Sequence, residues 1–146
     1  LLRLIRDLAA FEEAADQGLA PEELLRSEGF GPRPAFEALL AEVEGKAAGF
    51  ALFFHNFSTW QGRRGLYIED LYVAPWARKL GLGEKLVRAC AAIALERGCP
   101  RLDLQVLDWN PARGFYDRLG MERLAEWLPY RATGKVLHRL AKPEEA

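Results

Sequence analysis

One junction constrains the fold of this chain more than any other. The β-rich run 66–73, LYIEDLYV, is stopped by Pro75, and the stretch ARKLGLG then leads into an amphipathic run from Gly83 to Arg97. Apolar residues of that second run recur at helical spacing, and Gly98 stands where a glycine commonly ends a helix. A strand, a glycine-rich turn and a helix in this order are typical of an α/β fold.

The other segments extend this pattern. Periodicity and turn residues predict helices at 1–15, 22–25 and 111–119, and strands at 36–43, 49–57, 102–107, 122–128 and 136–140. Glu44-Gly45-Lys46 is suited to a hairpin turn, and 58–65 is expected to be a polar loop. The sequence therefore predicts a single α/β domain, 1–146, with a mixed sheet.

Composition excludes several classes of function. Twenty Lys and Arg stand against twenty-one Asp and Glu, a net charge of −1, so no broad basic surface is available for nucleic acid or a membrane. Two cysteines and two histidines, far apart in sequence, form neither a disulfide framework nor a metal-ligand pattern. We expect no metal and no cleavable signal, and a reduced, cytoplasmic protein.

The glycine turn has two interpretations. A helix N-terminus exposes unpaired N–H groups that bind phosphate where glycine lets the ligand approach, and Arg78, Lys79 and Lys85 add positive charge. Neither a P-loop nor a dinucleotide fingerprint fits, because Glu84 follows Gly83 and Leu86 replaces a third glycine. A plain turn from strand to helix is the alternative to a pyrophosphate site.

Three segments together resemble one superfamily. Residues 78–83, RKLGLG, match the Arg/Gln-x-x-Gly-x-Gly/Ala signature of GNAT acyltransferases, and the runs 66–73 and 108–120 resemble the segments that precede and follow it there. Within GNAT, the stretches 4–12, 29–31, 67–70 and 109–110 resemble the diamine (spermidine/spermine) and thialysine acetyltransferases. The resemblance implies a twisted, mostly antiparallel sheet with splayed central strands. It also implies a strand before the first helix, which this sequence lacks, so we expect the natural chain to begin earlier.

The resemblance implies acetyl-coenzyme A as co-substrate. Its pyrophosphate would lie on the turn, and its pantetheine arm beside the preceding strand and the later Asn-containing segment, where one residue fewer than usual separates Asn110 from Phe115-Tyr116. The residues implied are Leu71, Tyr72, Val73, Arg78, Lys79, Leu80, Gly81, Leu82, Gly83, Glu84, Asn110, Pro111, Ala112 and Tyr116.

Two residues carry the predicted chemistry. An alkyl ammonium must lose a proton before it attacks a thioester, and Glu69 stands where polyamine enzymes place such a base. Tyr116 occupies the family's position for the acid that protonates the thiolate. The alternatives are a solvated strand end for Glu69 and Asp70, and a core aromatic for Tyr116. Neighbours on a strand point to opposite faces, so only one of the two carboxylates is expected to face the acetyl group.

The substrate is inferred from residues, most of them acidic, that match the family's amine pocket, although each acidic residue alone is more typical of a protein surface. The acidic members are Glu12, Glu69, Asp70, Asp103 and Glu126, and the others are Phe11 and Gln105. The prediction is direct N-acetylation of a small cationic amine, a polyamine or a lysine-like compound such as thialysine. The alternatives are acetylation of a protein amine and a non-catalytic acyl-coenzyme A sensor. A homodimer through the terminal strand around Val136-Leu137 is also expected.

Overall fold

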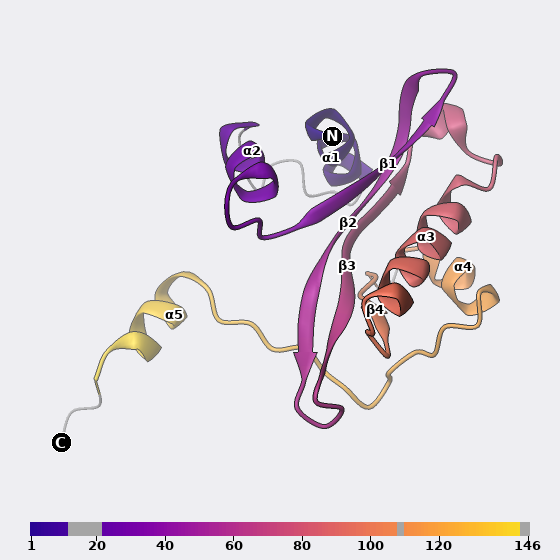
Figure 1. Ribbon diagram of the computed structural model, residues 1–146. Helices are drawn as coiled ribbons and strands as arrows, with labels where there is room; N and C mark the ends of the chain where they lie inside the picture. Colours follow the sequence, from indigo (N-terminus) through magenta and orange to yellow (C-terminus); the bar gives the residue numbers. More distant parts are fainter. Residues whose placement is uncertain (12–21, 108–109, 144–146) are drawn as a thin grey trace. The chain divides into compact units, whose positions relative to one another are not determined.

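The computed structural model describes residues 1–11, 22–107 and 110–143 (Figure 1). It contains two compact units, Leu1–Asp108 and Trp109–Ala146, which are described separately. None of the helices in the described ranges is long and apolar enough to cross a membrane.

The first unit is a four-stranded sheet flanked by helices. Its elements are α1 (Leu2–Phe11), α2 (Glu22–Phe30), β1 (Glu37–Val43), β2 (Lys46–Ser58), β3 (Arg63–Val73), the short 3-10 turn η1 (Pro75–Ala77), α3 (Leu82–Glu96) and β4 (Leu102–Leu104). The strand order is β1-β2-β3-β4. The β1–β2 and β2–β3 pairs are antiparallel and β3–β4 is parallel, which confirms the mixed, mostly antiparallel sheet.

Each face of the sheet has its own core. On one face, Ala51 and Phe53 of β2 pack with Leu66 and Ile68 of β3 against Cys90 of α3. On the other face, a second cluster gathers around Leu4 of α1. Its buried members are Leu4, Phe50, Leu52, Tyr72 and Ala74. Figure 1 shows α1 and α3 on opposite sides of the strands. The amphipathic patterns read from the sequence therefore place the two helices against the sheet.

The hairpins differ in how well their sequence predicts them. The predicted hairpin turn is present, with Glu44 and Gly45 between the paired residues Val43 and Lys46, and both turn residues have positive φ, 52° and 77°, as this type of turn requires. The expected loop 58–65 is shorter than predicted, because β2 continues to Ser58 and pairs there with Arg63 at the start of β3. A polar composition does not prevent pairing in an antiparallel hairpin, whose backbone bonds are satisfied whatever its side chains.

The C-terminal strands are the main error of the sequence prediction. In the second unit, α4 (Ala112–Arg118) is followed by an irregular segment over 122–133 and by α5 (Gly134–Ala141). A strand needs a pairing partner, and none is found for 122–128 among the described residues. Val136, Leu137 and Leu140 recur at spacings that also suit a helical face. The proposed dimer contact through a strand at Val136-Leu137 is therefore wrong in its secondary structure.

Candidate active site

Glu69 lies in a β-bulge. Leu52 of β2 pairs with Asp70 of β3, but the next β2 residue, Phe53, pairs with Ile68, so that Glu69 has no direct partner. Such an extra residue bends the strand and redirects its side chains, and bulges are frequent beside active sites. No periodicity in the sequence marks this position.

The bulge changes which residues face each side. Before it, Ile68 faces α3; after it, Leu71 packs into the same core as Ile68 although the two are three residues apart. Asp70 pairs with Leu52, which belongs to the α1 side. The alternation therefore leaves both Glu69 and Asp70 on the α1 side. The expectation that only one carboxylate can face a given side rests on a regular strand, and this strand is not regular.

Aromatic and acidic side chains share that face. Tyr67 pairs with Phe54 of β2, and their rings are 5.2 Å apart between centroids. On its other side Tyr67 pairs with Asp103 of β4, whose neighbours Leu102 and Leu104 point toward α3. Burial raises the pKa of the Tyr67 phenol, and the charges of Glu69 and Asp103 raise it further. The face thus combines carboxylates with an aromatic surface, which suits an organic cation.

The pairing of β3 with β4 stops halfway along β3. Its last matched pair is Ile68 with Leu104, so residues 69–73 have no β4 partner within the described part of the chain. The predicted strand 102–107 is shorter than expected, and Gln105 lies beyond it as an exposed residue. Alternate backbone groups of β3 in this stretch point away from β2. This opening agrees with the splayed central strands that the fold prediction contained.

Three residues beside this opening were predicted to meet the cofactor. Leu71 and Val73 pack partly buried against the α3-side core, and Tyr72 is buried beside Phe50. Their side chains are therefore core, which leaves only the backbone for a ligand. The carbonyl oxygen of Val73 already accepts a hydrogen bond of 3.1 Å from Arg78 Nε.

The glycine turn has the geometry of a helix entrance. Gly81 is the residue before α3 and has φ of 74°, a left-handed conformation that favours glycine, while Lys79 adopts a similar φ of 71°. The first helical bond runs from Lys85 N to Gly81 O at 3.1 Å, so the amides of residues 82–84 have no acceptor within the helix. A Cβ on Gly81 would meet no atom within 4 Å, which leaves the backbone open to approach. The turn therefore fits a phosphate group.

The side chains around the turn have their own contacts. Arg78 lies with its guanidinium carbon 6.0 Å from the centre of the Tyr72 ring. Glu84 is 3.5 Å from Arg88 one turn later. Leu80 is half exposed, whereas Leu82 and Gly83 form the first residues of α3. The anion-binding capacity of this turn therefore comes chiefly from its backbone.

In the second unit, Asn110 lies just before Pro111, the N-cap residue of α4. Its side-chain oxygen accepts a bond of 2.8 Å from Ala112 N, and the residue is only 9% exposed. The bond of Asn110 to its own backbone two residues on is typical of asparagine in turns. Pro111 is exposed and Ala112 begins the helix. Tyr116 is half-buried on α4, and its ring meets Phe115 edge-on with centroids 5.1 Å apart.

The remaining predicted residues contribute less. Phe11 ends α1, but its side chain and the whole of Glu12 lie outside the described residues. Glu126 is exposed in the irregular segment after α4. Arg101, which the sequence did not single out, lies 3.0 Å from Asp103 through Nε and Oδ2.

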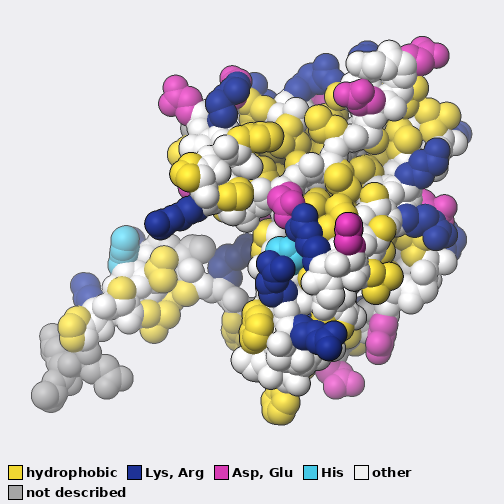
Figure 2. Space-filling model, in the orientation of Figure 1, with side chains coloured by type: hydrophobic (Ala, Val, Ile, Leu, Met, Phe, Trp, Pro, Cys, Tyr) yellow, Lys and Arg dark blue, Asp and Glu magenta, His cyan; other side chains and the backbone are white. Residues whose placement is uncertain are grey.

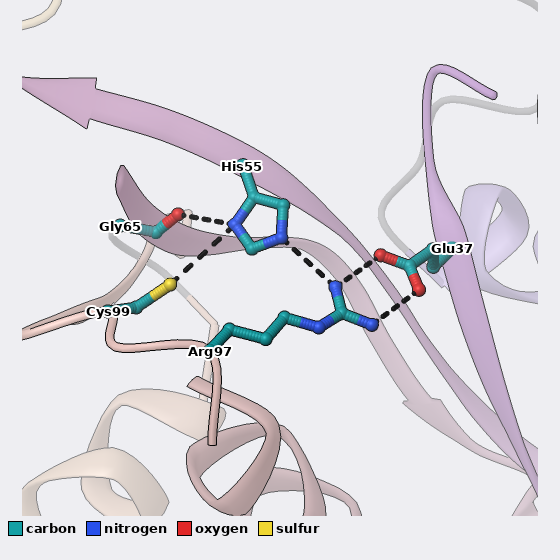
Figure 3. Close-up of polar contacts among 5 residues, drawn as sticks. All are labelled: Glu37, His55, Gly65, Arg97 and Cys99. Carbon is teal, nitrogen blue, oxygen red and sulfur yellow. Dashed lines mark hydrogen bonds and ion pairs between the residues drawn. The ribbon is translucent and has the colours of Figure 1, made fainter. Parts of the chain in front are cut away.

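A polar network links His55 with Cys99, a pair that sequence distance did not suggest (Figure 3). Cys99 Sγ lies 3.7 Å from His55 Nδ1, which is also 3.1 Å from the Gly65 carbonyl. A carbonyl only accepts, so Nδ1 carries the proton and Nε2 accepts a 3.0 Å bond from Arg97. The ring nitrogen beside the thiol is thus already protonated and cannot act as its base. The hydrogen bonds of this network tie β2 and the start of β3 to the end of α3 and the residues that follow it.

The described residues contain no group of three or more His, Cys, Asp and Glu side chains that could hold a metal ion. Basic and acidic side chains are interspersed over the visible face of the first unit (Figure 2). Charge selectivity must therefore be local, as the near-zero net charge predicted.

Sequence comparison decides the family. Residues 3–121 match the model of the acetyltransferase (GNAT) family. The chain belongs to the GNAT acetyltransferase family. This GNAT enzyme is 40% identical to the thialysine N-epsilon-acetyltransferase of Bos taurus, over 97% of the chain and 89% of the relative. It is 38% identical to the human spermidine/spermine N(1)-acetyltransferase-like protein 1, over 77% of the chain and 17% of that longer protein.

Solved structures agree on the fold of this GNAT enzyme. An integron cassette protein from the mobile metagenome of V. cholerae aligns with a TM-score of 0.79 at 28% identity, over 94% of the chain and 86% of the other. An aminoglycoside acetyltransferase from a soil metagenome aligns with a TM-score of 0.74 at 21% identity, over 90% and 88%. The predicted α/β GNAT fold and the resemblance to thialysine and spermidine/spermine acetyltransferases are confirmed.

Proposed function

We propose that this acetyltransferase moves an acetyl group from acetyl-coenzyme A to the primary amine of a small cationic molecule. The observation that carries the proposal is the position of Glu69, in a bulge on a sheet face that also presents Tyr67, Asp70 and Asp103. Carboxylates beside an aromatic surface attract an ammonium group, and one of them can take its proton. The named relatives support this choice, because thialysine, spermidine and spermine all carry primary amines on flexible chains.

The acetyl donor would lie along β3 and the glycine turn. Backbone amides of residues 82–84, at the entrance of α3, are suited to its pyrophosphate, and Lys79 and Lys85 add charge nearby in sequence. Its pantetheine arm would lie in the opening beside residues 69–73, where β3 lacks a β4 partner among the described residues. Acetyl-coenzyme A supplies the activated thioester when it is bound.

The transfer proposed is direct. Glu69 takes a proton from the ammonium, directly or through a water, and the neutral nitrogen attacks the thioester carbonyl. The new C–N bond forms as the C–S bond breaks, and the thiolate leaves with the sulfur's electron pair. The Tyr116 phenol stays protonated at neutral pH because its reference pKa lies above that of a thiol, and it donates its proton to the leaving sulfur. The phenolate then takes up the proton that the nitrogen loses as the amide forms, and Glu69 releases its own proton to solvent. Asp70 assists by adding negative charge beside Glu69.

The test is coenzyme A release from acetyl-coenzyme A with spermidine, putrescine, thialysine, lysine and a lysine peptide. We expect turnover with at least one small amine, and a loss of about 100-fold or more in kcat for Glu69→Gln and Tyr116→Phe, the usual range for general acid–base groups. Glu42→Gln, an exposed carboxylate on β1, is the matched control and should retain wild-type activity.

Other outcomes identify the alternatives. Turnover only with the lysine peptide would indicate a protein-amine acetyltransferase. Tight coenzyme A binding without turnover on any amine would indicate an acyl-coenzyme A sensor. The homodimer is a separate proposal, tested by the mass of the protein in solution.

A further inference from the structure

The face that carries Glu69 also holds an ion pair, Arg101 with Asp103. We propose that this pair binds the α-carboxylate and α-ammonium of a free amino acid whose terminal amine reaches Glu69. The inference rests on the proposed function and narrows it, since it makes the substrate a diamino acid rather than a polyamine.

The side chain of Arg101 lies over Gly65 of β3, which has no side chain of its own to occupy that space. A Cβ on Gly65 would lie 3.2 Å from Arg101 Cγ and Nε and 2.3 Å from Asn56 Oδ1, so only glycine leaves room for both side chains. Gly65 and Tyr67 are two residues apart on β3, before the bulge, and therefore point to the same side. Arg101, Tyr67 and Glu69 follow one another along a single face of the strand.

The pair keeps unused bonding capacity. The guanidinium has five N–H donors in a planar fork, and among the described residues its ion pair with Asp103 is made through Nε, at 3.0 Å. Asp103 is engaged there through Oδ2, which leaves Oδ1 as an acceptor. The side chains are 38% and 30% exposed, so part of each is accessible. A carboxylate can bind the Arg101 fork while an adjacent ammonium binds Asp103.

The spacing suits a lysine-length chain. Asp103 is level with Tyr67, and Glu69 lies two residues further along β3. Two strand residues span about 6.6 Å and neighbouring strands lie about 4.8 Å apart, so the Asp103 and Glu69 positions are about 8 Å from one another. A hydrogen bond of about 3 Å at each end of the substrate covers the part of this distance that its chain does not. The five bonds from the α-carbon to the terminal nitrogen of lysine or thialysine extend over about 6 Å, from bonds of about 1.5 Å in a staggered chain. With its head group at the ion pair, such a substrate would lay its aliphatic part on Tyr67 and place its amine at Glu69.

A polyamine has no group for Arg101. Its second ammonium can bind Asp103, but no group of the ligand binds the Arg101 fork, and the two positive charges then lie close together. A diamino acid instead offers a carboxylate at that point. The ion pair thus discriminates between the two substrate classes on charge.

The experiment compares lysine with two matched analogues. Cadaverine is lysine without the carboxylate, and 6-aminohexanoate is lysine without the α-ammonium. For wild type we expect kcat/KM to be at least about 10-fold higher with lysine or thialysine than with cadaverine or spermidine, as the loss of charge-assisted hydrogen bonds predicts. Arg101→Met should lower kcat/KM about 10- to 100-fold for lysine, mainly through KM, and leave cadaverine within about twofold. Asp103→Asn should lower kcat/KM more for lysine than for 6-aminohexanoate, which has no α-ammonium.

Arg64→Met is the control, because Arg64 is an exposed arginine of the same strand on the opposite face. It should change none of these ratios. If the role of Arg101 is purely structural, Arg101→Met will lower kcat/KM equally for lysine and cadaverine, and Arg101→Lys will not restore a preference for lysine. Either result overturns the inference. A wild-type preference for spermidine would overturn it while the proposed acetyltransferase function stands. No turnover on any amine would overturn both.

Discussion

Arg97 donates hydrogen bonds to both carboxylate oxygens of Glu37, at 2.6 and 2.8 Å. The contact joins the residue that follows α3 to the first residue of β1, and the same guanidinium reaches His55 on β2 between them (Figure 3). The hydrogen bond from Arg97 lowers the pKa of Glu37, and the positive charge of Arg97 acts in the same direction against the smaller, opposite effect of burial. The tie between helix and sheet therefore depends on pH.

Glu37→Gln should destabilise the protein at neutral pH and not in acid. A carboxyl whose pKa is lower in the folded state stabilises the fold above its ordinary pKa of 4.5, and this contribution is lost as the pH falls through the lowered value. Because both side chains are partly exposed, we expect a loss of about 1 kcal/mol or less at pH 7. Urea unfolding of wild type and variant across this pH range measures the difference. Equal destabilisation at every pH would contradict the assignment, and Glu42→Gln is the control.

Gly65→Ala should destabilise the sheet. The new methyl group would lie 2.3 Å from Asn56 Oδ1, a separation that side chains do not tolerate, so β2 or Asn56 must move. Overpacking of this kind costs about 1–3 kcal/mol. Gly114→Ala is the matched control, since that glycine lies inside α4 and its methyl would meet only the flexible end of Arg118 at 3.3 Å. Denaturant midpoints of the two variants should move in opposite directions.

Gly81→Ala should weaken coenzyme A binding. Its φ of 74° is unfavourable for alanine by about 1–2 kcal/mol, so the turn must shift or carry strain. Either change displaces the amides at the start of α3 that are proposed to hold the pyrophosphate. Calorimetric titration with coenzyme A should show a weaker affinity than for wild type. Gly45→Ala, in the distant hairpin with φ of 77°, carries the same strain and should leave the affinity unchanged.

Cys90 should be unreactive in the folded protein. Burial raises the pKa of its thiol to about 11, so at pH 8 only about one molecule in a thousand carries the thiolate. Cys99 is also buried, at 2% exposure. We expect slow alkylation of both thiols by iodoacetamide in native buffer and rapid alkylation after denaturation. Fast modification of Cys90 in native protein would show that its core opens readily.

The sequence by itself determined the local elements of this protein. Helical spacing located α3, the turn residues Glu44-Gly45-Lys46 located the first hairpin, and Pro75 marked the end of β3, because each depends on a few neighbouring residues. The signature at 78–83 led to the GNAT family, which the comparisons confirm. These features depend on the conformational preferences of residues that are neighbours in the sequence, so the sequence alone predicts them.

Only the tertiary structure decided the pairing between distant segments. The bulge that turns Glu69 and Asp70 to one side arises from the register of β2 against β3, and the contact of His55 with Cys99 joins residues 44 positions apart. The predicted strands after 121 failed for the same reason, since a strand exists only with a partner and the apolar spacing at 136–140 suits a helix equally well. Strand register and strand pairing depend on packing between residues far apart in the sequence, so they cannot be predicted from one sequence alone.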